Sequence, residues 1–129
     1  MFVADSSVFI DFLNARPGRE SDLLERAIEN EDQVCLCGPI LQEVLQGIRA
    51  EAEYQTAWCR LLDFTFFDTT RWTFLKAASL YRYLRKKGAT VNSFDTTIAA
   101  VCLENYVPLL TRDKRDFAPM ARYAGLKLV

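Results

Sequence analysis

The chain has 129 residues, and half of them are hydrophobic, which predicts one compact domain over residues 1–129 built around a single core. It contains no histidine, which excludes a histidine general base, a Ser-His-Asp triad and a histidine-ligated zinc site. The formal net charge is only −1, yet residues 1–70 carry 13 acidic and 5 basic side chains while residues 71–129 carry 4 and 11, so a basic face can lie beside an acidic pocket.

The first half of the chain alternates short apolar runs with amphipathic stretches. The run at residues 2–4 predicts a strand, and residues 8–13 predict a short helix that Ser6 or Ser7 caps. The elements expected next are a helix over about 20–30, a strand over 34–37, a helix opened by Gly38-Pro39 that runs to about 48, and a helix over about 51–62.

The second half continues this alternation. We expect a strand over 64–67 and then a long helix, capped by residues 68–70 and closed near Gly88. One stripe of this helix recurs at helical spacing and is expected in the core: Phe74, Ala77, Ala78, Tyr81 and Leu84. The remaining elements are a helix over about 95–105, a strand over 107–110, a loop turning into a short helix over 111–117, and a final strand over 126–128.

Short apolar strands that alternate with helices indicate a parallel sheet covered on both faces. The expected fold class is therefore α/β, a three-layer α/β/α sandwich with a central, mostly parallel sheet. The apolar runs are far shorter than the ~20 residues that cross a bilayer, and the first strand follows no basic leader, so we expect a cytoplasmic protein without membrane contact.

The cysteines lack the spacing of a zinc site, since no CxxC pair occurs among Cys35, Cys37, Cys59 and Cys102. A strand over 34–37 points the first two thiols to one face. We therefore expect all four to be small buried side chains in a reducing compartment.

Four acidic side chains are expected near the same edge of the sheet in this architecture. Asp5 follows the first strand and Asp113 follows the strand over 107–110, while Glu43 lies one turn into the helix after the second strand and Asp95 lies in the first turn of its own helix. Ligands of open parallel sheets bind outside the carboxyl ends of the strands. If these strands are neighbours, the four acids converge there.

Converging carboxylates repel one another, and a divalent cation offsets that repulsion. Mg²⁺ prefers hard oxygen ligands and retains several waters, Mn²⁺ fits the same ligands, and either ion can support hydrolysis of a phosphodiester without histidine. Each acid also has a purely structural interpretation, such as a helix-terminal charge for Asp95 or a turn former for Asp113. Asp5 is the hardest to explain that way, because it interrupts a buried apolar run.

Four segments of the chain resemble the motifs of PIN-domain proteins. They are MFVADSSVFIDFL at 1–13, GPILQEV at 38–44, NSFDTTIAA at 92–100 and LLTRDKRDF at 109–117. Their order and spacing are similar to those of VapC-like toxins of toxin-antitoxin modules. The resemblance implies a Mg²⁺- or Mn²⁺-dependent endoribonuclease that inhibits growth when free. It also implies a cognate VapB-like antitoxin, a homodimer, and operator DNA bound only through the antitoxin.

Carried over to this chain, the resemblance makes Asp5, Glu43, Asp95 and Asp113 the catalytic acids. Asp5 and Asp95 would ligate the metal directly and Asp113 would hold a metal-bound water, while Glu43 would orient or deprotonate the attacking water.

Neighbouring polar residues have supporting roles in this interpretation. Ser6 and Thr111 would fix the orientation of the carboxylates through hydrogen bonds. Asp116 lies three residues after Asp113, so either could be the fourth acid; the Thr-x-Asp pattern favours Asp113, which leaves Asp116 to pair or cap.

Basic side chains beside the fourth motif could hold RNA phosphates: Arg112, Lys114 and Arg115. A second basic cluster, over 82–87, is interpreted as a solvated helix face or a partner of the helix dipole.

Two other functions compete with the ribonuclease. One is a catalytically weak PIN-like module that acts as a partner in a DNA-bound repressor complex; the complete set of acids argues against it. The other is a receiver-type phosphoacceptor, which would require an aspartate at the end of a middle strand, where this chain has Gly38-Pro39.

Overall fold

The computed structural model describes residues 1–129 and centres on four parallel strands. They are β1 (Phe2–Ala4), β2 (Val34–Cys37), β3 (Thr65–Phe67) and β4 (Leu109–Leu110), and their order in the sheet is β3-β2-β1-β4. The predicted final strand is reduced to a single parallel bridge between Leu109 and Leu128. Because β1 has β2 and β4 as its two neighbours, the segments that follow these three strands emerge at one edge of the sheet.

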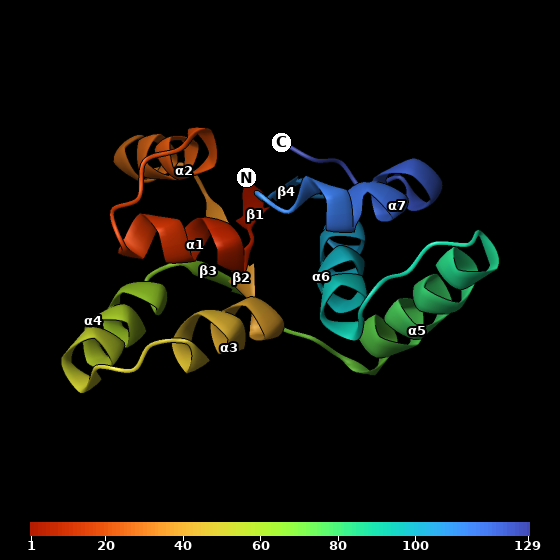
Figure 1. The fold of residues 1–129 in the computed structure, drawn as a ribbon, viewed down its shortest axis with the longest axis horizontal. Helices are drawn as coiled ribbons and strands as arrows, with labels where there is room; N and C mark the ends of the chain where they lie inside the picture. The colour runs from red at the N-terminus through yellow and green to blue at the C-terminus, as the bar shows by residue number, and fades with distance from the viewer.

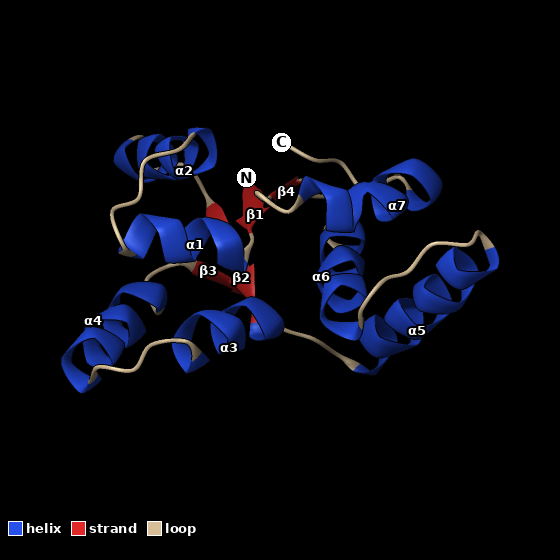
Figure 2. Ribbon diagram, in the orientation of Figure 1, coloured by secondary structure: helices blue, strands red, loops and turns tan.

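Seven helices surround the strands. They are α1 (Ser6–Leu13), α2 (Arg19–Glu29), α3 (Gly38–Gln46), α4 (Glu51–Leu61), α5 (Arg71–Lys86), α6 (Ser93–Glu104) and α7 (Lys114–Ala124). Figure 1 shows α1 to α4 on one side of the strands and α5 to α7 on the other, and Figure 2 shows the strands between the two groups. The predicted α/β sandwich with a parallel sheet is thus confirmed. None of the helices combines the length and the apolar character that a bilayer crossing requires.

The core is continuous across the sheet, since 25 buried residues form one hydrophobic cluster. All four residues of β2 and both residues of β4 are buried, which is expected of parallel strands covered on both faces. Phe9 of α1 and Phe117 of α7 are among the largest fully buried side chains. Each such side chain contributes about 1.5–3 kcal/mol on burial, so the strand ends that carry the site are firmly held.

Three predictions about local structure were wrong. The helix after β1 begins at Ser6 and its N-cap is Asp5, whose main-chain oxygen accepts hydrogen bonds from the N–H groups of Val8 (3.0 Å) and Phe9 (3.2 Å). The last helix does not stop at 117 but continues past Pro119 to Ala124. Cys59 lies exposed on α4, whereas the other three cysteines are buried.

The buried stripe of α5 also differs from the prediction. Its buried residues are Thr73, Ala77, Leu80 and Leu84, and Phe74 is 55% exposed. The Thr73 hydroxyl donates to Glu104 of α6 (2.9 Å) and caps the backbone N–H of Thr70, which turns residue 73 and not 74 toward α6.

Candidate active site

The four predicted acids lie where the parallel sheet directs them. Asp5 follows β1 immediately, and its backbone N–H donates to the carbonyl of Leu110 in β4 (2.9 Å). Asp113 is the N-cap of α7, Asp95 is in the first turn of α6, and Glu43 is on α3.

The Asp5 carboxylate is the most buried of these acids, with 3% of the residue exposed. Two hydroxyls donate to its Oδ2, that of Thr111 at 2.8 Å and that of Ser7 at 3.1 Å. Burial raises the pKa of Asp5 above its ordinary value even though these hydrogen bonds lower it, and the charge of Asp113 adds to the rise. The folded chain therefore holds a carboxylate whose negative charge is only partly compensated.

Thr111 connects the first and fourth motifs. It is fully buried, donates to Asp5, and accepts a hydrogen bond from the backbone N–H of Asp113 (2.9 Å). Ser7 makes a parallel link, since its hydroxyl accepts from the backbone N–H of Arg112 (3.2 Å). Together with the hydrogen bond from Ser7 to Asp5, these three hydrogen bonds fix the segment after β4 against Asp5.

Ser6 and Ser7 donate hydrogen bonds to two different acids. The Ser6 hydroxyl donates to Oε2 of Glu43 at 2.7 Å and thereby ties α1 to α3. Ser7, which the sequence interpretation considered only as a helix cap, donates to the Asp5 carboxylate instead. Successive residues of a helix point about 100° apart, and that rotation sends the two hydroxyls to different carboxylates.

Asn92 is a second residue that the sequence interpretation missed. As the N-cap of α6 it accepts from the backbone N–H of Asp95 (2.8 Å), and its amide donates to Oδ2 of the same aspartate (2.8 Å). An asparagine three residues before an acid at a helix start is the sequence signal for such a cap. It holds the Asp95 side chain in one orientation.

Burial and the charges of neighbouring acids both change the pKa of the Asp95 carboxyl. Burial raises its pKa to about 6, and the charges of Asp5, Asp116 and Glu43 contribute to the rise. Asp113 acts in the same direction on Asp5. Both candidates for the fourth acid are therefore close to the cluster, Asp113 on the side of Asp5 and Asp116 on the side of Asp95.

The donor set of this cluster fits a hard divalent cation. Its atoms are carboxylate and hydroxyl oxygens, and the nearby thiol of Cys37 stays protonated because burial raises its pKa to about 12. No three acidic side chains lie close enough to ligate one ion together. Mg²⁺ suits such an arrangement, because it takes one or two carboxylates directly and contacts others through its waters.

Two of the three predicted RNA-binding cations have partners within the chain. Arg112 forms an ion pair with the buried carboxylate of Asp11, and Lys114 lies 3.7 Å from Glu20. Arg115 is exposed and has no carboxylate partner.

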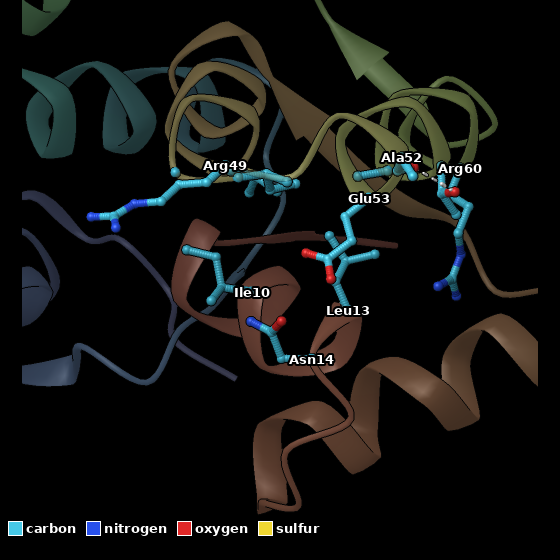
Figure 3. Close-up of a pocket in the computed structure, with 12 residues that line it drawn as sticks. Ile10, Leu13, Asn14, Arg49, Ala52, Glu53 and Arg60 are labelled. Atoms are coloured by element: carbon cyan, nitrogen blue, oxygen red, sulfur yellow. Dashed lines mark hydrogen bonds between the residues drawn. The ribbon is translucent and has the colours of Figure 1, made fainter.

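A cavity of about 440 Å³ opens between α1, α3 and α4, and none of the four acids lines it. Figure 3 shows Ile10 and Leu13 of α1 facing Ala52 and Glu53 of α4, with Arg49 and Arg60 at the two ends. This groove is a surface separate from the acid cluster.

Known proteins resemble this chain in both sequence and fold. VapC ribonuclease Mb1587 of Mycobacterium bovis and ribonuclease VapC11 of Mycobacterium tuberculosis are each 28% identical over 133 residues, covering 98% of this chain and 96% of theirs. Among solved structures, DNA-bound VapBC from Salmonella typhimurium superposes with a TM-score of 0.82 at 19% identity, covering 99% of this chain and 96% of that one. VapC20 of Mycobacterium tuberculosis, a toxin that cleaves the sarcin-ricin loop, gives 0.74 at 15% identity, covering 100% and 98%.

These structural likenesses establish the parallel fold, and the family follows from the sequence itself. The model of the PIN domain matches residues 2–125, which span all four motifs and the strands that carry them. The chain belongs to the PIN-domain family.

Proposed function

We propose that this chain is a Mg²⁺- or Mn²⁺-dependent endoribonuclease, a single PIN domain that serves as the toxin of a VapBC-type pair. The observation that carries the proposal is the buried Asp5 carboxylate, which two hydroxyls hold; burial raises the pKa of the nearby Asp95, and the charge of Asp5 adds to that rise. The relatives named VapC ribonuclease support the same activity.

The proposed division of labour follows the hydrogen bonds. Asp5 and Asp95 would ligate the cation directly, and Asp113 would hold one of its waters; when bound, the cation lowers the pKa of a water and offsets charge on phosphate oxygens. Glu43, oriented by Ser6, accepts a proton from the attacking water. The water oxygen bonds to phosphorus, the bond from phosphorus to the 3′ oxygen breaks, and that oxygen takes a proton, which leaves a 5′-phosphate and a 3′-hydroxyl.

The proposal includes a protein partner. Several similar folds were solved as VapBC complexes, two of them on DNA, and this supports a VapB-like antitoxin that contacts operator DNA itself. We place the protein in the cytoplasm as a homodimer, with free toxin inhibiting growth by cleaving RNA.

A cleavage assay tests the proposal. Purified chain with Mg²⁺ should cut single-stranded RNA, EDTA should stop it, and Asp5→Asn should lower the rate by at least about 100-fold. Asp22→Asn, which neutralises an exposed acid of α2, is the matched control and should cut normally. Full activity of Asp5→Asn would refute the proposal.

The second candidate is a PIN-like module without useful catalysis. The observation in its favour is that no three acids lie close enough to ligate one ion. It predicts no RNA cleavage by the wild-type chain with either cation, and undiminished binding of the antitoxin–DNA complex by Asp5→Asn.

A further inference from the structure

A basic pocket lies outside the acid cluster, between the end of α5 and α7. Its volume is about 310 Å³, and its charged residues are Lys87, Arg115 and Arg122, with Tyr123 beside them. No acidic residue lines it. These two helices pack against each other at the edge of the molecule in Figure 1.

The cations of this pocket are free of carboxylates, because none of the ion pairs in the structure includes Lys87, Arg115 or Arg122. Tyrosine rings hold two of them instead. Nζ of Lys87 lies 5.5 Å from the ring centroid of Tyr83 and 5.8 Å from that of Tyr123, and the guanidinium carbon of Arg122 lies 5.1 Å from Tyr123. A cation over an aromatic face keeps its charge and its hydrogen-bond donors available to an anion.

The sequence around α5 strengthens this field. Residues 69–94 contain six basic side chains and no acidic one. The chain end of α5 is also fixed, because Gly88 has a φ of 81° and the N–H groups of Gly88 and Ala89 donate to the carbonyls of Arg85 and Leu84, both at 3.0 Å. Lys87 is thereby held at the rim of the pocket.

Helix α7 carries residues of both the pocket and the acid cluster. Arg115 lines the pocket, and the next residue, Asp116, acts electrostatically on Asp95. The cations on the other side of the cluster, Arg112 and Lys114, are occupied by Asp11 and Glu20. A polyanion that approaches the acids from the side of Asp116 therefore meets unpaired positive charges in this pocket.

We propose that this basic pocket binds backbone phosphates of the RNA strand on one side of the scissile bond. The inference rests on the proposed function, since it takes RNA as the substrate. The pocket offsets the repulsion between phosphates and the acid cluster, and it contributes affinity without sequence choice.

A binding experiment without cleavage tests the pocket. The probe is a fluorescently labelled single-stranded RNA, measured by anisotropy in EDTA over a range of salt concentrations. Lys87→Gln/Arg122→Gln should weaken binding about tenfold and reduce the slope of log K against log salt by about 1.4, since each lost phosphate contact removes about 0.7 on single strands. Arg26→Gln/Lys127→Gln removes the same charge from two exposed sites outside the pocket and outside α5 and should change binding less than about twofold.

The outcomes separate this inference from the proposed function. If the wild-type chain binds RNA through the pocket but never cuts it, the role of the pocket in binding RNA phosphates stands and the ribonuclease proposal fails. If the chain cuts RNA and the pocket variant binds it as tightly as the control variant does, the inference is overturned. It is equally overturned if a polyglutamate peptide binds in a pocket-dependent way while RNA binding ignores the substitutions, because the surface then serves an acidic protein partner.

Discussion

Asp5 keeps a carboxylate at the end of a fully buried strand, where desolvation disfavours its charge. The Thr111 and Ser7 hydroxyls recover part of that free energy and simultaneously fix the carboxylate in one orientation. Under the proposed function, a bound cation would offset the remaining deficit, and the fixed carboxylate would need little rearrangement to ligate it.

At Asp95 the effect of charge on stability depends on pH. Its pKa is about 6 in the folded protein against 3.8 for an unperturbed aspartate, so the folded state binds more protons between these values and the free energy of unfolding falls as pH rises through that window. Asp95→Asn removes this loss. In EDTA at pH 7.5 we expect its melting temperature to exceed that of wild type by about 3–5 °C, after allowance for solvent screening of a half-buried group.

Calorimetry at two pH values checks this expectation. The gain should vanish near pH 3.5, where the wild-type carboxyl is protonated as well. Asp22→Asn, on the exposed side of α2, should show no gain at either pH. A gain of equal size at both pH values would mean that charge is not its cause.

Thr111 offers a test of the hydrogen bonds around Asp5. Thr111→Val keeps the shape of the side chain but removes the donor to Asp5 and the acceptor for the N–H of Asp113, so we expect unfolding to become easier by about 1–3 kcal/mol. Thr111→Ser retains the hydroxyl and should recover most of that loss. Urea denaturation measures both variants, and equal stabilities would contradict the role of the hydroxyl.

At the scale of the element, helix starts decide which side chains reach the site. The sequence predicted a helix after β1 and a cap nearby, but not that Asp5 would be the N-cap with Ser6 and Ser7 as the first two helical residues. A shift of one residue in the start rotates every later side chain by about 100°. That is why the sequence indicated hydroxyl support for the carboxylates but could not assign Ser7 to Asp5 and Ser6 to Glu43.

The start of α6 couples stability to the site. Asn92→Ala removes the cap of Asp95 N–H and the amide that orients the Asp95 carboxylate, so we expect a loss of about 1 kcal/mol together with weaker Mg²⁺ binding. Asn105→Ala, at the other end of the same helix, loses only a hydrogen bond to the Val101 carbonyl and should leave Mg²⁺ binding unchanged. Thermal melts and Mg²⁺ titration of both variants measure the two effects, and unchanged Mg²⁺ affinity in Asn92→Ala would exclude an orienting role.

In α5 and α7, the buried residues and the helix end differ from those that the hydrophobic pattern predicted. Periodicity predicted α5 correctly but placed Phe74 in the core. Phenylalanine is more hydrophobic than threonine, so the pattern favoured burial of residue 74 over residue 73. The structure buries Thr73 instead, since its hydroxyl finds Glu104 of α6. In α7, burial of Phe117 and Met120 stabilises the helix on both sides of Pro119. The helix ends at its C-cap Gly125, which has a φ of 77°.

At the scale of the whole molecule, the parallel sheet brings the segments after β1 and β4 to the same edge. Alternation of strands and helices was enough to predict that Asp5 and Asp113 share an edge, because that depends only on strand direction. Hydrogen bonds from Ser6 and Thr111 to the carboxylates were predicted, but the partner of each side chain was not, since these pairs join residues far apart in the chain: Ser6 with Glu43, Thr111 with Asp5, and Arg112 with Asp11.

Mg²⁺ should stabilise the entire fold. A cation that binds the folded chain and not the unfolded one adds about 2.7 kcal/mol to the free energy of unfolding when its concentration is a hundred times its Kd. We expect the melting temperature to rise with Mg²⁺, to fall back with EDTA, and to be insensitive to Mg²⁺ in Asp5→Asn. An identical response of wild type and Asp5→Asn would place the cation elsewhere.

The uneven burial of the cysteines leaves one thiol accessible to labelling reagents. Three thiols are enclosed, whereas Cys59 stands in water on α4, the helix that forms one wall of the groove in Figure 3. A maleimide dye will therefore attach at one position without any engineering. Its emission would report a partner that binds over α4 near Cys59, while the candidate catalytic acids remain chemically unmodified.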